Sequence, residues 1–280
     1  RLKEISQLGT GSVEIKSGYG LSVEGEIKML RVIKRLKENS DLLIKSTFLA
    51  GHAYPAEFKE NHKGYIDCII NEMLPIIARE NLADFIDVFC ETGFFSLEEM
   101  EEICIAGAAV GFQAKLHVNQ LNSIGGIEMG IKNNALSLDH LETLSELEIS
   151  LLGDFKGCST LLPTAAFFLR MHLQPARKLI NAGAAVTLGS DYNPGSSPSG
   201  NMNFVTALSC IQMKMLPEEV INAATINGAC AMNCENETGS IMIGKRADLI
   251  LTKKIPSVAY LFYSFSINNI ERVMLKGKWV

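Results

Sequence analysis

The sequence lacks the paired cysteines that hold a structural metal or build a disulfide framework. Its seven cysteines make an odd number, and no two of them are separated by only two residues. Most stand inside apolar runs such as 85-FIDVFC-90. Buried, reduced thiols explain this pattern better than disulfides or a thiolate zinc cluster, and we therefore expect a cytoplasmic protein.

Long hydrophobic runs and an excess of basic charge are also missing. No apolar stretch approaches the length of a membrane span, and the first residues lack the charged-then-apolar pattern of a signal peptide. The formal net charge is -5, with no matching basic patch. These absences argue against a membrane or a nucleic acid as a partner, and they favour a small-molecule substrate.

Apolar residues are plentiful enough for a sizeable core. The 280 residues are 47% hydrophobic and 20% charged, which suits one large domain or two smaller ones. Short apolar runs with the composition of strands alternate with longer segments of helical period. The predicted strands are 13-VEIKSG-18, 44-IKSTFLAG-51, 85-FIDVFCE-91, 113-QAKLHV-118, 135-ALSLDH-140, 158-CSTLLP-163 and 184-AAVTLGSD-191.

The segments between these runs have the pattern of helices that lie on a sheet. From Ser22 to about Lys37 an apolar stripe faces one side, and Ser96 with Glu99 forms a capping box at a second helix start. Buried strands joined by helical crossovers indicate a parallel α/β sheet. An open doubly wound sheet is the alternative, but no G-x-G-x-x-G or P-loop follows the first run.

Seven βα units are one short of the closed (β/α)8 barrel. The chain opens with RLKEISQLG, which has the pattern of the tail of an amphipathic helix without a cap. We therefore expect a (β/α)8 TIM-type barrel, of which strands 2 to 8 lie in this chain and the first precedes residue 1.

The pattern changes near residue 236. Two predicted helices, about 203–213 and 217–232, follow the last barrel strand. Segments 239–252 and 270–280 then alternate like short strands with Gly-Lys turns. We predict a barrel domain over residues 1–235 and the C-terminal part of a small β-sandwich domain over 236–280. The aromatic segment 256–269 either packs on the barrel or forms an interface between two copies of the chain. The second alternative would give a homodimer.

Polar side chains end several of the predicted strands. In such barrels the C-terminal strand ends meet at one mouth, where the chemistry takes place. One histidine at a strand end is usually structural, but three of the five histidines occupy equivalent positions here. We therefore predict a site built from His52, His117, His140 and Asp191.

Imidazole and carboxylate ligands without thiolate suit zinc or another divalent first-row metal. His117 and Asp191 supply two of the roughly three protein ligands that a catalytic site needs. His140 either supplies a third or acts beside the metal.

Seven stretches, spread over almost the whole chain, carry a family resemblance. They are 16-KSGYGLS-22, 48-FLAGHAYP-55, 87-DVFCETGFF-95, 115-KLHVNQ-120, 138-LDHLE-142, 191-DYNPGSSPSGNMNF-204 and 239-GSIMIGKRADLIL-251. These stretches resemble the amidohydrolase superfamily, and within it the hydrolases that open the ring of 4-imidazolone-5-propanoate. The resemblance implies a (β/α)8 barrel with a β-sandwich, one divalent metal ion, zinc or iron, and four protein ligands. Two ligands would form a His-x-His pair that this sequence lacks, and the other two match His117 and Asp191.

The resemblance also implies a reaction and its residues. A cyclic amide would be hydrolysed to N-formimidoyl-L-glutamate, with Asp191 carrying the proton and His140 assisting the water or the substrate carbonyl. The predicted substrate-binding residues are Tyr19, His52, Gln120, Asn193 and Gly195. Gln120 stands where many members have Glu, and because an amide carries no proton at neutral pH, proton transfer would fall to Asp191 or water.

Two other functions remain open at this point. A deaminase of a cytosine- or guanine-like ring would use the same kind of metal site but release ammonia. An inactive, metal-free fragment is the other alternative, because the sequence contains only half of the expected ligands.

Overall fold

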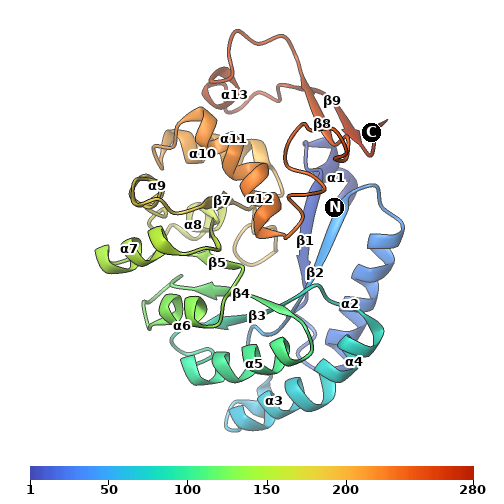
Figure 1. Cartoon of the computed structure of the whole chain (residues 1–280), viewed down its shortest axis with the longest axis vertical. Helices are drawn as coiled ribbons and strands as arrows, with labels where there is room; N and C mark the ends of the chain where they lie inside the picture. Colours follow the sequence, from blue (N-terminus) through green and yellow to red (C-terminus); the bar gives the residue numbers. More distant parts are fainter. The chain divides into compact units, whose positions relative to one another are not determined.

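The computed structural model describes all 280 residues and contains one sheet of seven strands. The strands follow one another in chain order from β1 to β7, as in a (β/α)8 barrel (Figure 1). All seven predicted strands are present, and the predicted fold class is confirmed. Their bounds are β1 Ser12–Lys16, β2 Leu43–Gly51, β3 Phe85–Cys90, β4 Gln113–Val118, β5 Ser137–His140, β6 Cys158–Leu161 and β7 Val186–Leu188.

The chain forms two compact units. One consists of residues 14–139, and the other of residues 1–13 together with 140–280. The first unit contains β2 to β4 and most of β1 and β5, and the second contains β6, β7 and the C-terminal segment. The boundary near residue 236 stays a prediction.

In the unit of residues 14–139, helices lie along the outer side of β2, β3 and β4 (Figure 1). Ser22 caps the first helix by accepting a hydrogen bond from the Gly25 backbone N–H, and Ser96 and Glu99 form the predicted capping box. The helices of this unit are α2 Val23–Glu38, η1 Ala56–Phe58, α3 His62–Cys68, η2 Ile69–Met73, α4 Leu74–Glu80, α5 Leu97–Ala109 and α6 Gly126–Lys132.

Strands β2, β3 and β4 of this unit are almost entirely buried, whereas β1 is half-buried. Every residue of β3 is buried, and β3 pairs in parallel with both β2 and β4. Buried strands of a parallel sheet have continuous apolar sequences, which explains why these strands could be predicted from the sequence. Asp87 in β3 and Lys115 in β4 break this pattern, since both are charged and almost fully buried.

The second unit contains β6 and β7, which pair in parallel, and a small antiparallel sheet. That sheet consists of β8 Leu249–Thr252, β9 Ile270–Leu275 and β10 Lys278–Trp279. The helices of this unit are α1 Leu2–Gln7, α7 Glu146–Asp154, α8 Pro163–Leu169, α9 Ala176–Ala182, α10 Met202–Ile211, α11 Pro217–Ala224, α12 Ile226–Ala231 and α13 Tyr260–Tyr263.

Two sequence predictions in this unit are wrong in detail. The single helix predicted over 217–232 is interrupted at Thr225, whose φ of -123° and ψ of -88° are not helical. The strand predicted over 239–252 begins only at Leu249, because Gly239 and Gly244 adopt positive φ values of 84° and 91° that turn the backbone.

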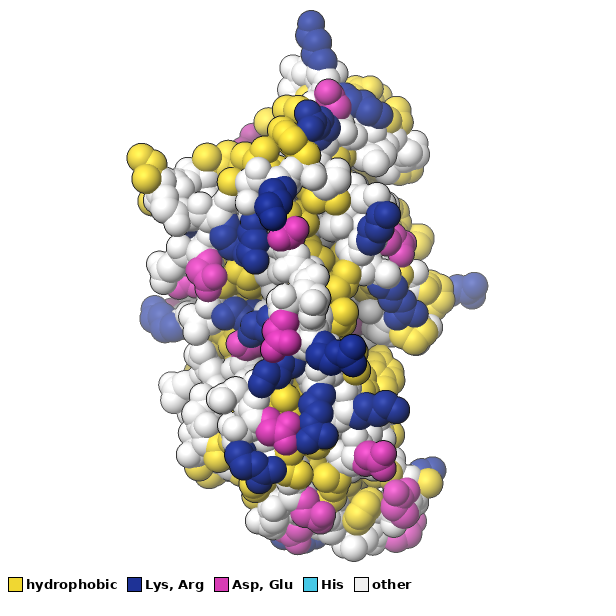
Figure 2. All heavy atoms as spheres, turned by 90° about the vertical axis from the view of Figure 1, so that its right-hand side faces the viewer, with side chains coloured by type: hydrophobic (Ala, Val, Ile, Leu, Met, Phe, Trp, Pro, Cys, Tyr) yellow, Lys and Arg dark blue, Asp and Glu magenta, His cyan; other side chains and the backbone are white.

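None of the helices is both long and apolar enough to cross a membrane. On the face shown in Figure 2, Lys and Arg side chains are interspersed with Asp and Glu, so that face carries no uninterrupted patch of one sign. Helix α2 contributes such pairs, with Arg31 2.7 Å from Glu80 and Lys37 3.0 Å from Asp84.

Candidate active site

A charge cluster occupies the strands of the first unit, and we define it as Glu14, Lys16, Asp87, Lys115 and Asp139. Successive side chains of a strand alternate between faces, so Glu14 and Lys16 of β1 share a face, as do Lys115 and His117 of β4. The Nζ atom of Lys16 lies 2.8 Å from Glu14, 2.7 Å from Asp87 and 3.2 Å from Asp139. Lys115 lies 3.1 Å from Glu14.

Electrostatic interactions favour the ionised forms of Asp87 and Lys16. Burial alone would raise the pKa of Asp87, but His117 and Lys16 outweigh it and hold that pKa below its ordinary value. Burial likewise opposes the charge of Lys16, yet Asp87, Glu14 and Asp139 raise its pKa well above the usual value. The carboxylates and ammonium groups therefore stabilise one another in their charged forms.

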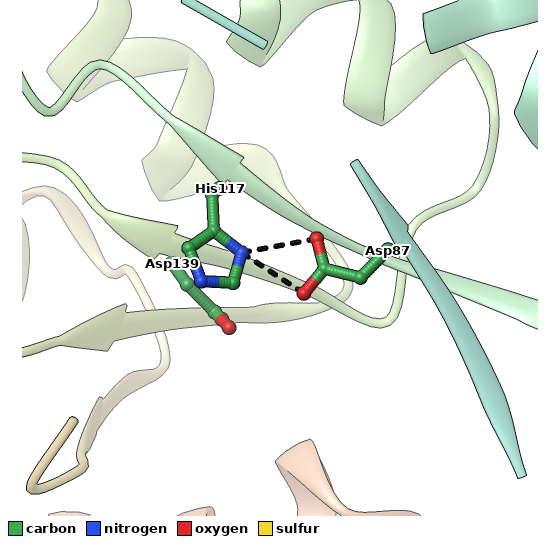
Figure 3. A group of neighbouring side chains, drawn as sticks. All are labelled: Asp87, His117 and Asp139. Carbon is green, nitrogen blue, oxygen red and sulfur yellow. Dashed lines mark hydrogen bonds and ion pairs between the residues drawn. The ribbon is translucent and has the colours of Figure 1, made fainter. Parts of the chain in front are cut away.

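His117, the predicted metal ligand at the end of β4, is oriented by this charge cluster. Its Nδ1 atom lies 3.0 Å from Oδ1 and 2.9 Å from Oδ2 of Asp87, as the dashed lines in Figure 3 show. A metal-binding histidine commonly donates one ring N–H to a carboxylate, which fixes the tautomer and the ring plane. The second ring nitrogen, Nε2, is therefore the atom that would coordinate a metal.

Asp87, His117 and Asp139 also form a group whose ligand atoms all lie within 4.8 Å of one another. Both carboxylates of this group already contact the Lys16 ammonium, and Asp139 also accepts a hydrogen bond of 2.7 Å from Ser137. A cation bound by both carboxylates would lie close to that ammonium. The contacts of Asp87 and Asp139 with Lys16 therefore favour His117 over these carboxylates as the group that would face a metal.

Replacing Asp87 with asparagine is expected to weaken metal binding. Loss of the carboxylate behind a ligating histidine typically lowers metal affinity by about 10- to 100-fold, because the imidazole becomes less basic and less well oriented. A competition titration of the full-length protein with a chromogenic chelator measures this change. Asp67→Asn, an exposed partner of Lys63, is the matched control and should leave the affinity unchanged. Equal affinities in both variants would contradict the orienting role.

Three predicted substrate-binding residues, Tyr19, His52 and Gln120, lie in the same unit as His117. Tyr19 is 57% exposed, and its ring meets that of His52 edge to face at a centroid distance of 5.3 Å. The Phe89 ring lies 6.2 Å from both the His52 and the His117 rings. Tyr19, His52, Phe89 and His117 thus form a continuous row of rings.

Gln120 lies in the loop that follows β4, beside the end of the strand that carries His117. Glu91, which is 1% exposed, fixes this loop by accepting hydrogen bonds from the backbone N–H groups of Leu121 at 2.8 Å and Asn122 at 3.0 Å. Asn119 adopts a positive φ of 55° at the start of the loop. Gln120 is therefore held on a fixed backbone, in a half-buried position.

In the second unit, Asp191, Asn193 and Gly195 lie together in one loop. The carboxylate of Asp191 accepts a hydrogen bond of 2.7 Å from the Ser196 hydroxyl. The Asn193 amide donates to the Asp191 carbonyl and to Ser196 Oγ, and it accepts from the N–H groups of Gly195 and Ser196. Because these bonds use the full capacity of the amide, the visible task of Asn193 is to shape the loop that holds Asp191.

His140 is buried at the end of β5 in the same unit. Its Nδ1 atom lies 3.4 Å from Oε1 of Glu142, and Gln174 donates a hydrogen bond of 2.7 Å to that same oxygen. The residues His140, Leu141 and Asp191 have φ values of 86°, 65° and 48°. Non-glycine residues rarely adopt such values, and they concentrate at functional sites.

The predicted residues are divided between the two units, and the printed contacts join Tyr19, His52 and His117 through their rings and Asp191, Asn193 and Gly195 within one loop. Tyr19, His52, Gln120 and His117 belong to the first, and His140, Asp191, Asn193 and Gly195 to the second. Sequence reasoning missed Asp87 and Glu91. The available signal for Asp87 was a carboxylate in the middle of an apolar strand, and for Glu91 a carboxylate at the end of that strand.

The comparisons with known proteins agree with this fold. A model of the amidohydrolase family matches residues 25–280. The imidazolonepropionase of Flavobacterium johnsoniae is 56% identical over 278 residues, which cover 99% of this chain and 68% of that protein. The imidazolonepropionase of Christiangramia forsetii is 51% identical over 280 residues, covering 100% of this chain and 68% of its own length.

Solved structures resemble this chain in fold at much lower sequence identity. A triazine hydrolase variant superimposes with a TM-score of 0.79 at 14% identity, covering 99% of this chain and 69% of that one. An adenosine deaminase from Xanthomonas campestris with bound zinc has a TM-score of 0.69 at 16% identity, covering 89% of this chain and 63% of its own. These likenesses support the barrel fold and nothing narrower.

Proposed function

Since this chain belongs to the amidohydrolase family, we propose that it hydrolyses the cyclic amide C–N bond of 4-imidazolone-5-propanoate to N-formimidoyl-L-glutamate, a step of histidine degradation. The chain is a metal-dependent hydrolase that acts on carbon–nitrogen bonds. The observation that carries the substrate is the 56% identity to an imidazolonepropionase over 99% of the chain.

We further propose that the divalent metal is zinc or iron, held by His117 and Asp191 of this chain together with other ligands. Imidazole and carboxylate donors suit both metals. The contact between His117 Nδ1 and Asp87 supports the choice of His117, because it leaves Nε2 as the ring atom that would coordinate the metal. When bound, the metal supplies a water whose pKa falls to about 7 and which attacks at neutral pH.

The proposed roles of the protein groups follow from proton movement. Water adds to the amide carbonyl carbon, the bond to the ring nitrogen breaks, and a carboxylate forms. Asp191 takes the proton from the water and delivers it to the departing nitrogen. His140 donates to the carbonyl oxygen as its negative charge grows, an interaction that is stronger in the transition state than in the ground state. Glu142 restrains the His140 ring through Nδ1.

Substrate binding is proposed for Tyr19, His52, Gln120, Asn193 and Gly195. Tyr19 and His52 belong to the row of rings that reaches His117. This row supports the proposal that the planar imidazolone ring binds beside Tyr19 and His52. Gln120 would hydrogen-bond the imidazolone without exchanging protons. Gly195 has no side chain, and it lets a substrate approach the loop backbone closely.

We also propose that the protein acts in the cytoplasm on a small molecule, without nucleic acid or membrane as a partner. The segment 256–269 remains the candidate interface for a homodimer, since Tyr263 and Phe265 are 79% and 61% exposed.

A product assay tests the function. The full-length protein with 4-imidazolone-5-propanoate is expected to form N-formimidoyl-L-glutamate in proportion to the imidazolone lost, with no release of ammonia. Chromatography with mass detection quantifies the product, and an enzymatic ammonia assay runs in parallel. Ammonia released from cytosine or guanine, with the imidazolone left intact, would favour the deaminase alternative instead.

A further inference from the structure

Glu26 is a fully buried carboxylate that holds a loop rather than a cation. Its side chain is 0% exposed, and no Lys or Arg forms an ion pair with it. It accepts backbone N–H hydrogen bonds from Gly18 at 3.0 Å and 3.2 Å, from Gly20 at 2.7 Å and from Leu21 at 3.1 Å. We call residues 17–22 the Tyr19 loop.

These bonds go beyond ordinary capping of helix α2. Ser22 already accepts the N–H of Gly25 and serves as the cap. Glu26 reaches back past that cap to donors that precede the helix. Burying a carboxylate is unfavourable unless hydrogen bonds replace the lost water, and several converging backbone N–H groups form such an anion site.

The backbone of the Tyr19 loop is shaped to make this contact. A Cβ atom at Gly20 would lie 2.3 Å from the carbonyl carbon of Gly25, so the loop and the start of α2 touch backbone to backbone. Gly18 has a φ of 101°, and a Cβ there would lie 2.7 Å from the Leu49 carbonyl oxygen. The glycines permit this close approach of the backbones, and the hydrogen bonds to the Glu26 carboxylate stabilise it.

The side chain that this loop displays is Tyr19. Its neighbours in the loop turn their N–H groups to Glu26, while its own ring is 57% exposed and lies against His52. His52 in turn contacts the Gly18 carbonyl oxygen through Nδ1 at 3.1 Å. The two rings are therefore attached to a single anchored backbone.

We propose that Glu26 is a positioning residue that fixes the Tyr19 loop in its substrate-binding form. The inference rests on the proposed function, in which Tyr19 contacts the imidazolone. A loop ordered in advance needs less ordering when substrate binds, so Glu26 lowers KM more than it changes kcat.

The test is Glu26→Gln, which keeps the shape but places an NH2 group against backbone N–H donors. Loss of hydrogen bonds to a charged group is expected to raise KM by about 10- to 100-fold while kcat changes much less. Amide hydrogen exchange should lose protection at Gly18, Gly20 and Leu21. Glu24→Gln is the matched control, since Glu24 is an exposed residue of the same helix and has no role in the site; it should change neither readout.

A double-mutant cycle separates positioning from general destabilisation. With Tyr19→Ala as background, Glu26→Gln should raise KM little further, because Glu26 acts through that ring. Glu26→Asp retains the charge with one methylene fewer, and it provides a folded variant that should show a smaller increase in KM.

Unchanged exchange protection together with an unchanged KM in Glu26→Gln overturns the proposal. Fully additive effects of Glu26→Gln and Tyr19→Ala on KM also overturn it. If the unmodified protein opens no imidazolone ring, the proposed function fails, and hydrogen exchange alone decides whether Glu26 holds the loop.

Discussion

Asp191→Asn lowers kcat for ring opening by at least about 10³-fold in the mechanism proposed above, because an amide cannot accept the proton of the attacking water. It also removes a negative metal ligand. The substitution keeps size and shape, and asparagine tolerates the positive φ of 48° at this position. The loop should therefore fold as before.

Steady-state kinetics on the full-length protein measure this effect, with metal content and the thermal unfolding midpoint determined on the same samples. Asp154→Asn, an exposed carboxylate at the end of α7, is the matched control and should retain full activity. Undiminished activity in Asp191→Asn would make Asp191 an ordinary turn residue, held by Ser196 for structural reasons alone.

Lys115→Met is expected to reduce the free energy of unfolding by about 3–5 kcal/mol, because it breaks a buried ion pair and leaves Lys16 as the one ammonium group among the three carboxylates of the charge cluster. Lys115 is 2% exposed and lies 3.1 Å from Glu14. Methionine fills a similar volume, so the loss arises from charge rather than from a cavity. Urea unfolding curves measure the change.

Two further variants isolate the cause of this loss. Lys132→Met removes an exposed ion pair with Glu101 and should change the unfolding free energy by less than about 1 kcal/mol. Adding Glu14→Gln to Lys115→Met should restore part of the stability, because the uncompensated charge is removed. An equal loss of unfolding free energy in Lys115→Met and Lys132→Met would show that the buried ion pair stabilises the fold no more than the exposed one.

The barrel strands could be predicted from the sequence because burial on both faces imposes continuous apolar runs. The run 85–91 is the clearest case, and β3 occupies residues 85–90 with every side chain buried. The role of Asp87 could not be predicted in the same way, because the apolar pattern of the run does not indicate what a carboxylate within it contacts. Its partners, His117 and Lys16, come from strands 30 and 71 residues away in the chain.

The positions of the candidate site were predictable because strand ends can be located before the structure is known. His140 ends β5, and His117 is the last residue but one of β4, as expected. The loop-holding roles of Glu26 and Glu91 were not predictable. Glu26 lies in a helix and Glu91 directly follows a strand, and their roles depend on which backbone N–H groups the fold brings to them.

Smaller errors arose where backbone geometry outweighs composition. The interruption at Thr225 lies within a continuous helical pattern, so nothing in the spacing of apolar residues indicates it. Residues 239–248 were predicted as part of a strand with a Gly-Lys turn, but the backbone turns at Gly239 as well as at Gly244, and the strand begins only at Leu249. The role of Asn193 in substrate binding stays a prediction.

The measurement that tests metal-dependent ring opening most directly is the product assay before and after metal removal. The full-length protein, treated with a chelator and then dialysed, should form no N-formimidoyl-L-glutamate from 4-imidazolone-5-propanoate. One equivalent of zinc or ferrous iron should restore product formation without ammonia, and the Asp87→Asn variant should require more metal for the same recovery. Full ring-opening activity in the metal-depleted protein would contradict the proposed mechanism.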